Sequence, residues 1–453
     1  MAGHIKPRKD GKGRTRYQAR IRNPLNPSKD IVQTFDRRGD ARDWLTAQAS
    51  AVQLGNFIDP RRASRPAREV VGAWRETWAD LEPKTRVGYE SMLTTHFLPV
   101  FGDAPIGKIT AHALQAHFNA RAEALAPKTL RNVYGVFSGV FRVAVEHRYI
   151  PVSPLDPVKL PKGKRKRLGG RMLHLSPQEV AQLADAMPSP RLRVAVLLAA
   201  YQGPRAGELW ALRRRDIDPL RRQVYFVNAI KEINSSAATL DGEKGLVLGP
   251  PKSGEDRNNR LPQFLVDELA ALLAEPSPAG RDGVLVIRET DDGPQFARSP
   301  DPFDPDAVVF ATERGYAVRH NSFYKRTFRP LIVGRAALPA KRGRRARPAV
   351  PGLWPEGHRL HKLRWHDLRH TAAALSLAVE PNLLIVKERL GHGDIRTTVN
   401  TYGHLLPSVE ERLTDGLDEL YARYRADADD DSDTPGNVAE LHPRPGDEQA
   451  EAA

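Results

Sequence analysis

Residues 390–404 of this chain carry the sequence Leu-Gly-His-Gly-Asp-Ile-Arg-Thr-Thr-Val-Asn-Thr-Tyr-Gly-His. The stretch places a glycine-flanked histidine, His392, ten residues before Tyr402. A tyrosine beside a helix is most often a packing residue, so the stretch by itself defines no chemistry. Its meaning depends on two clusters that occur earlier in the chain.

The first of these clusters is Gly-Pro-Arg-Ala-Gly-Glu-Leu at residues 203–209, directly after the apolar run Val194–Tyr201. That run has the length and composition of a buried helix. The second is Trp-His-Asp-Leu-Arg-His-Thr at residues 365–371. Taken singly, an arginine beside a glycine indicates a turn, and a histidine three residues before an arginine indicates one polar face of a helix.

The composition of the whole chain favours a polyanionic partner. Its 453 residues carry a formal net charge of +15 and a pI of about 9.9. A nucleic acid is the leading candidate, and the alternative is a basic soluble protein from an arginine-rich proteome. The absence of cysteine excludes disulfides and thiolate metal sites. No apolar run approaches the ~20 residues of a membrane span, and the N-terminus lacks the apolar segment of a signal peptide. We therefore expect a cytoplasmic protein without a membrane partner.

Together the three clusters resemble the tyrosine recombinase (phage integrase) family. The family pattern is an Arg in a Gly-rich turn before Glu-Leu, then His-x-x-Arg, then Leu-Gly-His, then a Tyr about ten residues later, and all four parts occur here in order. The resemblance is specific over about 195–265 and 360–406 and weaker over the segments before them. It does not extend to residues 280–356 or to the C-terminal tail.

This resemblance implies a lambda-integrase-like site-specific recombinase. Such an enzyme cleaves and rejoins DNA through a covalent 3′-phosphotyrosine intermediate and integrates or excises a phage or another mobile element. The implied partners are double-stranded DNA attachment sites and three further copies in a homo-tetramer on DNA, and an accessory DNA-bending or excision factor is left open. No cofactor is implied.

The residue types in the clusters fit that chemistry. A phosphodiester under attack gathers negative charge, which the fixed cationic forks of Arg205 and Arg369 would neutralise. His392 would donate a further hydrogen bond to a phosphate oxygen, and His366 would either donate similarly or accept the proton of the nucleophile. Tyr402 is the predicted nucleophile, because a phenol can form the covalent phosphotyrosine.

The leaving 5′-oxygen needs a proton, which the resemblance assigns to a lysine on a β-hairpin. Lys252, in Pro-Lys-Ser-Gly at residues 251–254, is the best match, although the sequence after it departs from the usual pattern by about one residue. Lys231 and Lys244 remain alternatives. Glu208 is expected to orient its neighbours, and His404 is either a minor donor or a structural cap.

The sequence disfavours two other chemistries. His366 and His370 have the spacing of a helical zinc pair, but no Glu stands between them and the intervening Arg369 would repel a cation. We therefore predict no metal site. Hydrolysis by a Ser-His-Asp triad is disfavoured because the chain lacks a Gly-x-Ser-x-Gly turn.

The predicted fold is multidomain and mainly α with small β-sheets. Residues 1–62 have two alternating segments, near 17–21 and 32–34, and a helix that Asp40 could cap. They predict a basic sheet-plus-helix domain of the arm-binding type, and a disordered basic arm is the alternative. Residues 66–157 predict an all-helical core-binding domain, with helices at about 85–99, at about 111–124 and along the apolar face of residues 130–144.

A basic linker is predicted at 158–173, and its DNA-contacting candidates are Lys159, Lys162, Lys164, Arg165, Lys166 and Arg167. Residues 174–424 predict an α+β catalytic domain, with a capped helix start at Ser176 and Glu179 and strands near 223–228 and 260–265. A basic insertion, expected to be a loop, falls at about 280–356. Residues 425–453 are rich in Asp and Glu and predict a disordered tail.

The segment after the predicted nucleophile has an apolar helical face, formed by Val409, Leu413, Leu417, Leu420, Tyr421 and Tyr424. It could pack on its own domain or on a neighbouring protomer. Alternatives to an active integrase are a catalytically silent DNA-binding relative with a structural or regulatory role, a topoisomerase-like enzyme and a chromosome-dimer resolvase. The basic N-terminal segment favours the integrase.

Overall fold

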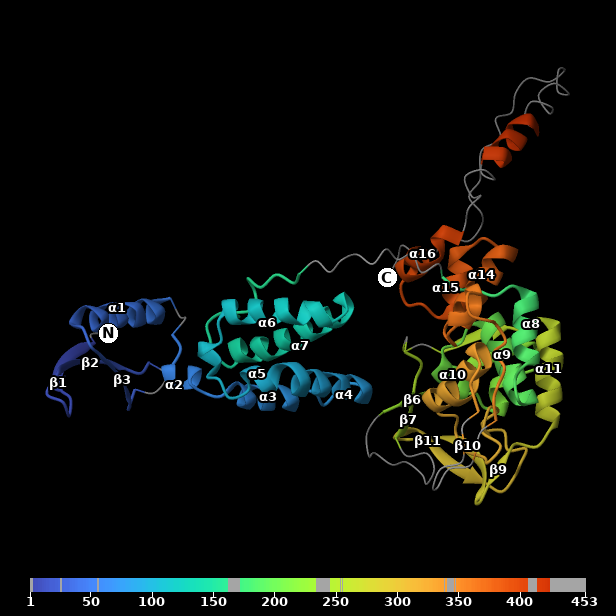
Figure 1. The fold of residues 1–453 in the computed structure, drawn as a ribbon, viewed down its shortest axis with the longest axis horizontal. Helices are drawn as coiled ribbons and strands as arrows, with labels where there is room; N and C mark the ends of the chain where they lie inside the picture. Colours follow the sequence, from blue (N-terminus) through green and yellow to red (C-terminus); the bar gives the residue numbers. More distant parts are fainter. Residues whose placement is uncertain are drawn as a thin grey trace, which may run out of the picture. The chain divides into compact units, whose positions relative to one another are not determined.

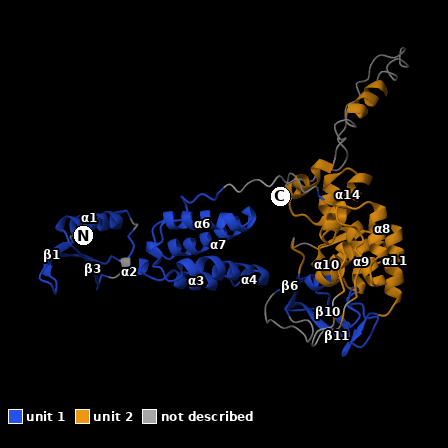
Figure 2. Cartoon of the chain, viewed as in Figure 1, with its two compact units in different colours: residues 1–172, 230–249, 277–323 blue, residues 173–229, 250–276, 324–453 orange. Residues whose placement is uncertain are grey.

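The computed structural model describes residues 3–24, 27–54, 57–161, 172–233, 245–252, 254, 256–337, 339, 346, 348–405 and 414–423. The chain divides into two compact units (Figure 2). The first comprises residues 1–172, 230–249 and 277–323, and the second comprises residues 173–229, 250–276 and 324–453. As predicted, the fold is mainly helical with small antiparallel sheets. No helix in the described part of the chain is long and apolar enough to cross a membrane.

The N-terminal part of the first unit is a three-stranded antiparallel sheet covered by one helix (Figure 1). Its elements are β1 (His4–Lys9), β2 (Thr15–Arg22), β3 (Asp30–Phe35) and α1 (Arg38–Gln53). Alternation along β2 turns Ala19 and Ile21 into the core against α1. The prediction that Asp40 caps this helix is wrong, because α1 begins earlier and Arg37 occupies the N-cap. Asp40 lies instead in the first turn, where a carboxylate interacts favourably with the helix dipole.

The helices that follow surround one apolar core. They are α3 (Ala67–Glu76), α4 (Pro83–Met92), a π-helical turn (Leu93–Phe97), α5 (Leu98–Phe101), α6 (Ala111–Ala124) and α7 (Pro127–Glu146). The predicted helix at 85–99 is thus part of a longer helical run that the π-turn interrupts. The predicted face of α7 is buried, with Val133, Phe137 and Val140 in the core.

Gly139 allows α3 and α7 to approach closely. A Cβ built on Gly139 would lie 2.3 Å from Cζ2 of Trp74, whereas a Cβ on Gly135, one turn earlier and exposed, meets nothing within 4 Å. We therefore expect Gly139→Ala to destabilise this helical part by roughly 1–3 kcal/mol through overpacking.

Gly135→Ala is the matched control and should stabilise α7 by roughly 0.5–1 kcal/mol, because alanine loses less backbone entropy in a helix. Hydrogen–deuterium exchange of α3 and α7 peptides in the full chain measures both effects. Equal exchange rates in the two variants would contradict the close-contact explanation.

The later parts of the first unit are mostly β-structure. They comprise β6 (Ala229–Glu232), β7 (Leu246–Gly249), β9 (Ala279–Gly280), β10 (Gly283–Thr290), β11 (Gly293–Ser299) and α12 (His320–Phe323). The expectation of a loop over 280–356 is therefore wrong. β10 and β11 form a hairpin, and residues 284–287 are buried because β10 also contacts Ala307. Among the basic residues of this insertion, Arg335 pairs with Val350 through an isolated β-bridge, and Lys341, Arg342, Arg344, Arg345 and Arg347 lie outside the described residues.

The second unit holds the three sequence clusters. Its main elements are α8 (Pro177–Asp185), α9 (Pro190–Gln202), α10 (Ala206–Trp210), β4 (Ile217–Asp218), β5 (Gln223–Phe226), β8 (Arg257–Arg260), α11 (Gln263–Ala274), α13 (Arg329–Val333), α14 (Asp367–Val379), α15 (Leu383–Leu390) and α16 (Ile395–Tyr402). The capping box of Ser176 and Glu179 is confirmed. The strand predicted at 260–265 is misplaced: β8 ends at Arg260, and Pro262 directly precedes α11 at its N-cap position.

The packing of α14 determines where the clusters meet. This helix lies against the buried helix α9 and also contacts α15, which contacts α16. The start of α14, the end of α9 and the ends of α15 and α16 are therefore neighbours although they lie far apart in the sequence. Residues 414–423 form a further helix, whose side chains are all exposed.

Candidate active site

Two helices end at glycines in the left-handed conformation. Gly203 follows α9 with φ +66° and Gly391 follows α15 with φ +64°. This backbone region is strained for residues with a Cβ. A Cβ on Gly203 would also lie 2.4 Å from Cδ2 of Leu390. Glycine is thus required at both turns, Gly203 in the cluster at 203–209 and Gly391 in the cluster at 390–404. At these turns the last main-chain carbonyl groups of α9 and α15 are free to accept hydrogen bonds from side chains.

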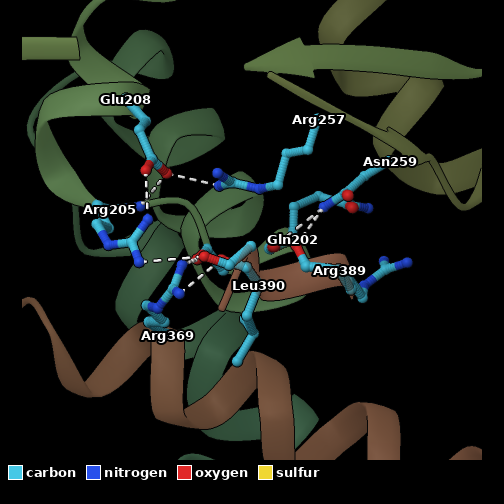
Figure 3. Close-up of polar contacts among 10 residues, drawn as sticks. Gln202, Arg205, Glu208, Arg257, Asn259, Arg369, Arg389 and Leu390 are labelled. Atoms are coloured by element: carbon cyan, nitrogen blue, oxygen red, sulfur yellow. Dashed lines mark hydrogen bonds and ion pairs between the residues drawn. The ribbon is translucent and has the colours of Figure 1, made fainter. Parts of the chain in front are cut away.

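These carbonyl groups hold the two predicted arginines (Figure 3). Arg369 donates from Nη1 to the Gly203 carbonyl and from Nη2 to the Leu390 carbonyl, both at 2.6 Å. Arg205 donates from Nη2 to the Gly391 carbonyl at 3.2 Å. The C-terminal ends of helices carry partial negative charge, which stabilises a guanidinium. Each arginine is therefore oriented by the glycine turn of another cluster. Burial lowers the pKa of Arg369 to about 9, which leaves it cationic at neutral pH.

Glu208 lies between two arginines. Its Oε1 is 2.8 Å from Nη1 of Arg205, and its Oε2 is 2.5 Å from Nη2 of Arg257. Oε2 also accepts the Arg205 backbone N–H at 2.8 Å. Burial alone would raise the pKa of this carboxyl, but the ion pairs with Arg257 and Arg205 outweigh burial and lower it.

Arg257 was not foreseen from the sequence. It opens β8, and its guanidinium lies over the ring of Phe226 at 4.5 Å from the centroid. Its Nε and Nη1 are buried without a hydrogen-bond partner among the described residues. An arginine in a strand five residues after Lys252 carries no sequence signal of a functional role. Only its ion pair with Glu208 in the structure shows that Arg257 belongs to the site.

The Glu208 network has a testable effect on stability. Because the folded-state pKa of Glu208 is depressed, its contribution is fully present above the ordinary value of 4.5 and is lost as pH falls through the folded-state pKa. Removing one partner of a buried ion pair costs roughly 3–5 kcal/mol. We expect Glu208→Gln to lower the urea midpoint of the second unit by a constant amount above pH 4.5 and by less below it.

The control is Glu268→Gln. Glu268 forms a half-exposed ion pair with Arg193, and such surface pairs contribute only about 0–1 kcal/mol. Urea unfolding from pH 3 to 7 compares the two variants. The same loss in both, or a Glu208→Gln loss that grows as pH falls, would contradict the role assigned to Glu208.

Tyr402 ends α16 and is almost completely buried, with 1% of its surface exposed. Its hydroxyl lies 3.0 Å from Nδ1 of His370. Burial raises the pKa of Tyr402 to about 12, although the nearby cation Arg369 acts in the opposite direction. Burial therefore outweighs the effect of Arg369 on this pKa, and the phenol is protonated in the free protein at neutral pH.

A second histidine, His392, also lies beside this tyrosine, whereas His366 contacts His370. The ring of His392 is nearly parallel to that of Tyr402, with centroids 6.4 Å apart, and its Nδ1 lies 2.9 Å from Oγ1 of Thr398. Burial, together with Arg369 and Arg205, lowers the pKa of His392 to about 4. His366 is exposed, and its ring is 5.3 Å from that of His370.

The predicted accessory residues are less closely tied to this site. Lys252 is exposed in the turn after β7, and no polar contact among the described residues joins it to the arginines. Lys231 pairs with Glu82 at 2.7 Å, and Lys244 lies outside the described residues. His404 is exposed in the short helix that follows Tyr402.

The predicted linker contacts fall mostly outside the described residues. Lys159 is described and exposed, and its backbone N–H donates to the Gln115 side chain at 2.9 Å. The remaining candidates Lys162, Lys164, Arg165, Lys166 and Arg167 lie outside the described residues. Within the described ranges, no group of three or more His, Asp or Glu side chains is arranged to hold a metal ion.

Comparison with known proteins relates the chain and its fold to integrases. A family model for the phage integrase central domain covers residues 64–159. The ICEBs1 integrase of Bacillus subtilis (strain 168) is 24% identical over 75% of this chain and 79% of its own length. The integrase of Mycobacterium phage D29 is also 24% identical, over 89% of this chain and 94% of its own length.

A solved structure has the same fold. The Tn1549 transposon integrase, in complex with transposon right end DNA, superposes with a TM-score of 0.56 at 16% identity and covers 78% of this chain and 99% of the solved chain. The fold and the matched relatives define a tyrosine-type DNA strand-breaking and rejoining enzyme. Over most of its length the chain is similar to tyrosine recombinases of the phage integrase type.

Proposed function

We propose that this protein is a site-specific DNA recombinase that integrates and excises a mobile element through a covalent 3′-phosphotyrosine intermediate. One observation carries the proposal: the hydroxyl of Tyr402 contacts His370 and lies near the cation Arg369, which two main-chain carbonyl groups hold in place. A phosphodiester placed there would meet both a nucleophile and fixed positive charge.

Each predicted site residue has a proposed role in strand cleavage. Arg205 and Arg369 neutralise the charge that develops on the non-bridging phosphate oxygens, because their guanidinium groups are already oriented. His366 and His392 donate further hydrogen bonds to the phosphate. Lys252 is the proposed proton donor to the leaving 5′-oxygen. Glu208 orients Arg205, and His404 is a minor support.

Double-stranded DNA is the proposed substrate, bound by several parts of the chain. Residues 66–157 would bind the core site together with residues 174–424, and 158–173 would cross the DNA backbone between them. Residues 1–62 would bind accessory sites, which fits their excess of Lys and Arg. Affinity should then depend mainly on phosphate contacts and fall with salt. The complex of the Tn1549 integrase with transposon DNA supports this proposal.

The decisive experiment traps the covalent intermediate. A nicked duplex loses the leaving fragment after cleavage, so the protein–DNA adduct accumulates. Digestion and mass spectrometry should locate the DNA on Tyr402. A protein that binds the attachment site without forming an adduct would instead be the silent relative, and relaxation of supercoiled DNA without strand exchange would indicate the topoisomerase-like activity.

We also propose a homo-tetramer on DNA whose subunits exchange the C-terminal helix. In the helix at 414–423, Leu417, Leu420 and Tyr421 are 56%, 66% and 62% exposed. Such an apolar face requires a partner. A neighbouring protomer is the proposed partner, because strand exchange requires four active sites and this segment follows directly after the nucleophile. Val409, Leu413 and Tyr424 lie outside the described residues.

Truncation after Leu406 tests this assembly. We expect the shortened protein to stay folded and to bind one half-site, because the deleted helix contributes no buried side chain. It should lose tetramers on DNA in analytical ultracentrifugation. Tetramers that persist would refute the exchange, and unfolding would mean that the helix stabilises its own domain.

A further inference from the structure

A base must remove the proton of Tyr402, and the family resemblance leaves His366 as the residue for that step. The structure points to a different histidine. Nδ1 of His370 lies 3.0 Å from the Tyr402 hydroxyl, which is within hydrogen-bond reach, and the two rings are 5.7 Å apart. His366 is exposed, and no described hydrogen bond joins it to the phenol. Nδ1 of His392 is already engaged by Thr398.

We propose that His370 is the general base that accepts the proton of Tyr402 during cleavage and returns it during religation. The inference rests on the proposed function, since it assigns one step of that reaction. With its own proton on Nε2, His370 presents the lone pair of Nδ1 to the phenol. His366 lies one turn earlier, at the N-cap position of α14, and is exposed. Because His370 takes the proton, His366 can donate a hydrogen bond to a DNA phosphate.

The proton and electron balance of the step is complete with groups already present. The O–H bond of Tyr402 breaks, its proton forms an N–H bond on Nδ1 of His370, and its electron pair forms the new O–P bond. The P–O5′ bond breaks, and its electron pair stays on the 5′-oxygen, which takes a proton from the general acid, Lys252 in our proposal. Religation reverses each transfer, so no oxidant, reductant or co-reactant is needed.

The surroundings keep His370 in the form that this role requires. Burial lowers the pKa of His370, Arg364 and Arg369 act in the same direction, and Asp367 opposes them. The imidazole is therefore neutral at physiological pH and able to accept a proton. The phenol of Tyr402, by contrast, holds its proton tightly, because burial raises its pKa to about 12. An adjacent base is therefore needed to remove this proton, since hydroxide in solution is scarce at neutral pH.

The test is single-turnover adduct formation on the nicked duplex, measured from pH 6 to 9 for the wild type, His370→Ala, His370→Gln and His366→Ala. General-base catalysis typically contributes 10²–10⁴-fold, so His370→Ala should be slower by about that factor. Its rate should rise about tenfold per pH unit where the wild-type rate is flat. Added imidazole should rescue His370→Ala, and more basic substituted imidazoles should rescue it better.

The Gln variant separates a base from a structural contact. Glutamine keeps a hydrogen bond to Tyr402 but accepts no proton, so His370→Gln should stay folded, bind DNA and cleave as slowly as His370→Ala. Cleavage by His370→Gln at the wild-type rate would overturn the proposal. So would imidazole rescue and the steep pH dependence appearing in His366→Ala instead of His370→Ala. Failure of the wild type itself to form an adduct on Tyr402 would be a separate result and would refute the proposed function.

Discussion

Replacing Tyr402 with phenylalanine should abolish covalent adduct formation while DNA binding remains nearly unchanged. The substitution removes one oxygen, which is the proposed nucleophile, and keeps the ring that fills the buried site at the end of α16. The interface with DNA depends on many phosphate contacts, so one phenolic oxygen contributes little to affinity. Loss of the hydrogen bond to His370 should lower stability by only about 1 kcal/mol.

The measurement combines adduct formation on the nicked duplex with an electrophoretic binding assay. Tyr201→Phe is the control, because Tyr201 is a half-buried tyrosine of the same unit without a proposed catalytic role. It should form adduct at the wild-type rate. Adduct formation by Tyr402→Phe would identify a different nucleophile, and loss of DNA binding would show that the substitution disturbs more than chemistry.

Arg369→Lys should slow adduct formation by at least about 10²-fold, although it conserves the charge. Loss of one preorganised donor at a developing oxyanion typically costs about 3–4 kcal/mol in barrier. A lysine ammonium is a point charge that cannot reproduce a planar fork. It also cannot occupy the positions of both Nη1 and Nη2, which hold the carbonyl groups of Gly203 and Leu390. Arg369→Ala should be slower still and less stable, since both carbonyls lose their partner.

Arg389→Lys is the matched control. Arg389 is half-buried, whereas Arg369 is buried, and like Arg369 it donates to a main-chain carbonyl group, that of Tyr201, at 3.0 Å. In Figure 3 its side chain points away from Arg205 and Arg369. It should lose stability without a large change in the single-turnover rate. If Arg369→Lys cleaves as fast as this control, the fork geometry of Arg369 has no catalytic role.

Much of the local structure followed from the sequence because it depends on short-range rules. The 3.6-residue spacing of apolar positions located α7, and the apolar run before the first glycine located α9. The box of Ser176 and Glu179 marked the start of α8. Two predictions from weaker patterns were wrong. A strand was expected at 260–265, but Pro262 directly precedes helix α11. A loop was expected where β10 and β11 form a hairpin, because the apolar residues of that segment show no clear periodicity.

The sequence alone determined which catalytic residue types the chain contains and in which order they occur. Two arginines, several histidines and a tyrosine near the C-terminal end lie in three motifs, and these motifs carry the family resemblance. Only the tertiary structure decided which of them touch. Packing of α14 against α9 and α15 brings Arg369 to the glycine turns and places His370 rather than His366 beside Tyr402, and the tertiary fold also brings Arg257 to Glu208. The physical reason is that hydrogen bonds act over about 3 Å, whereas the partners are separated by up to 186 positions in the chain, as with Arg205 and Gly391.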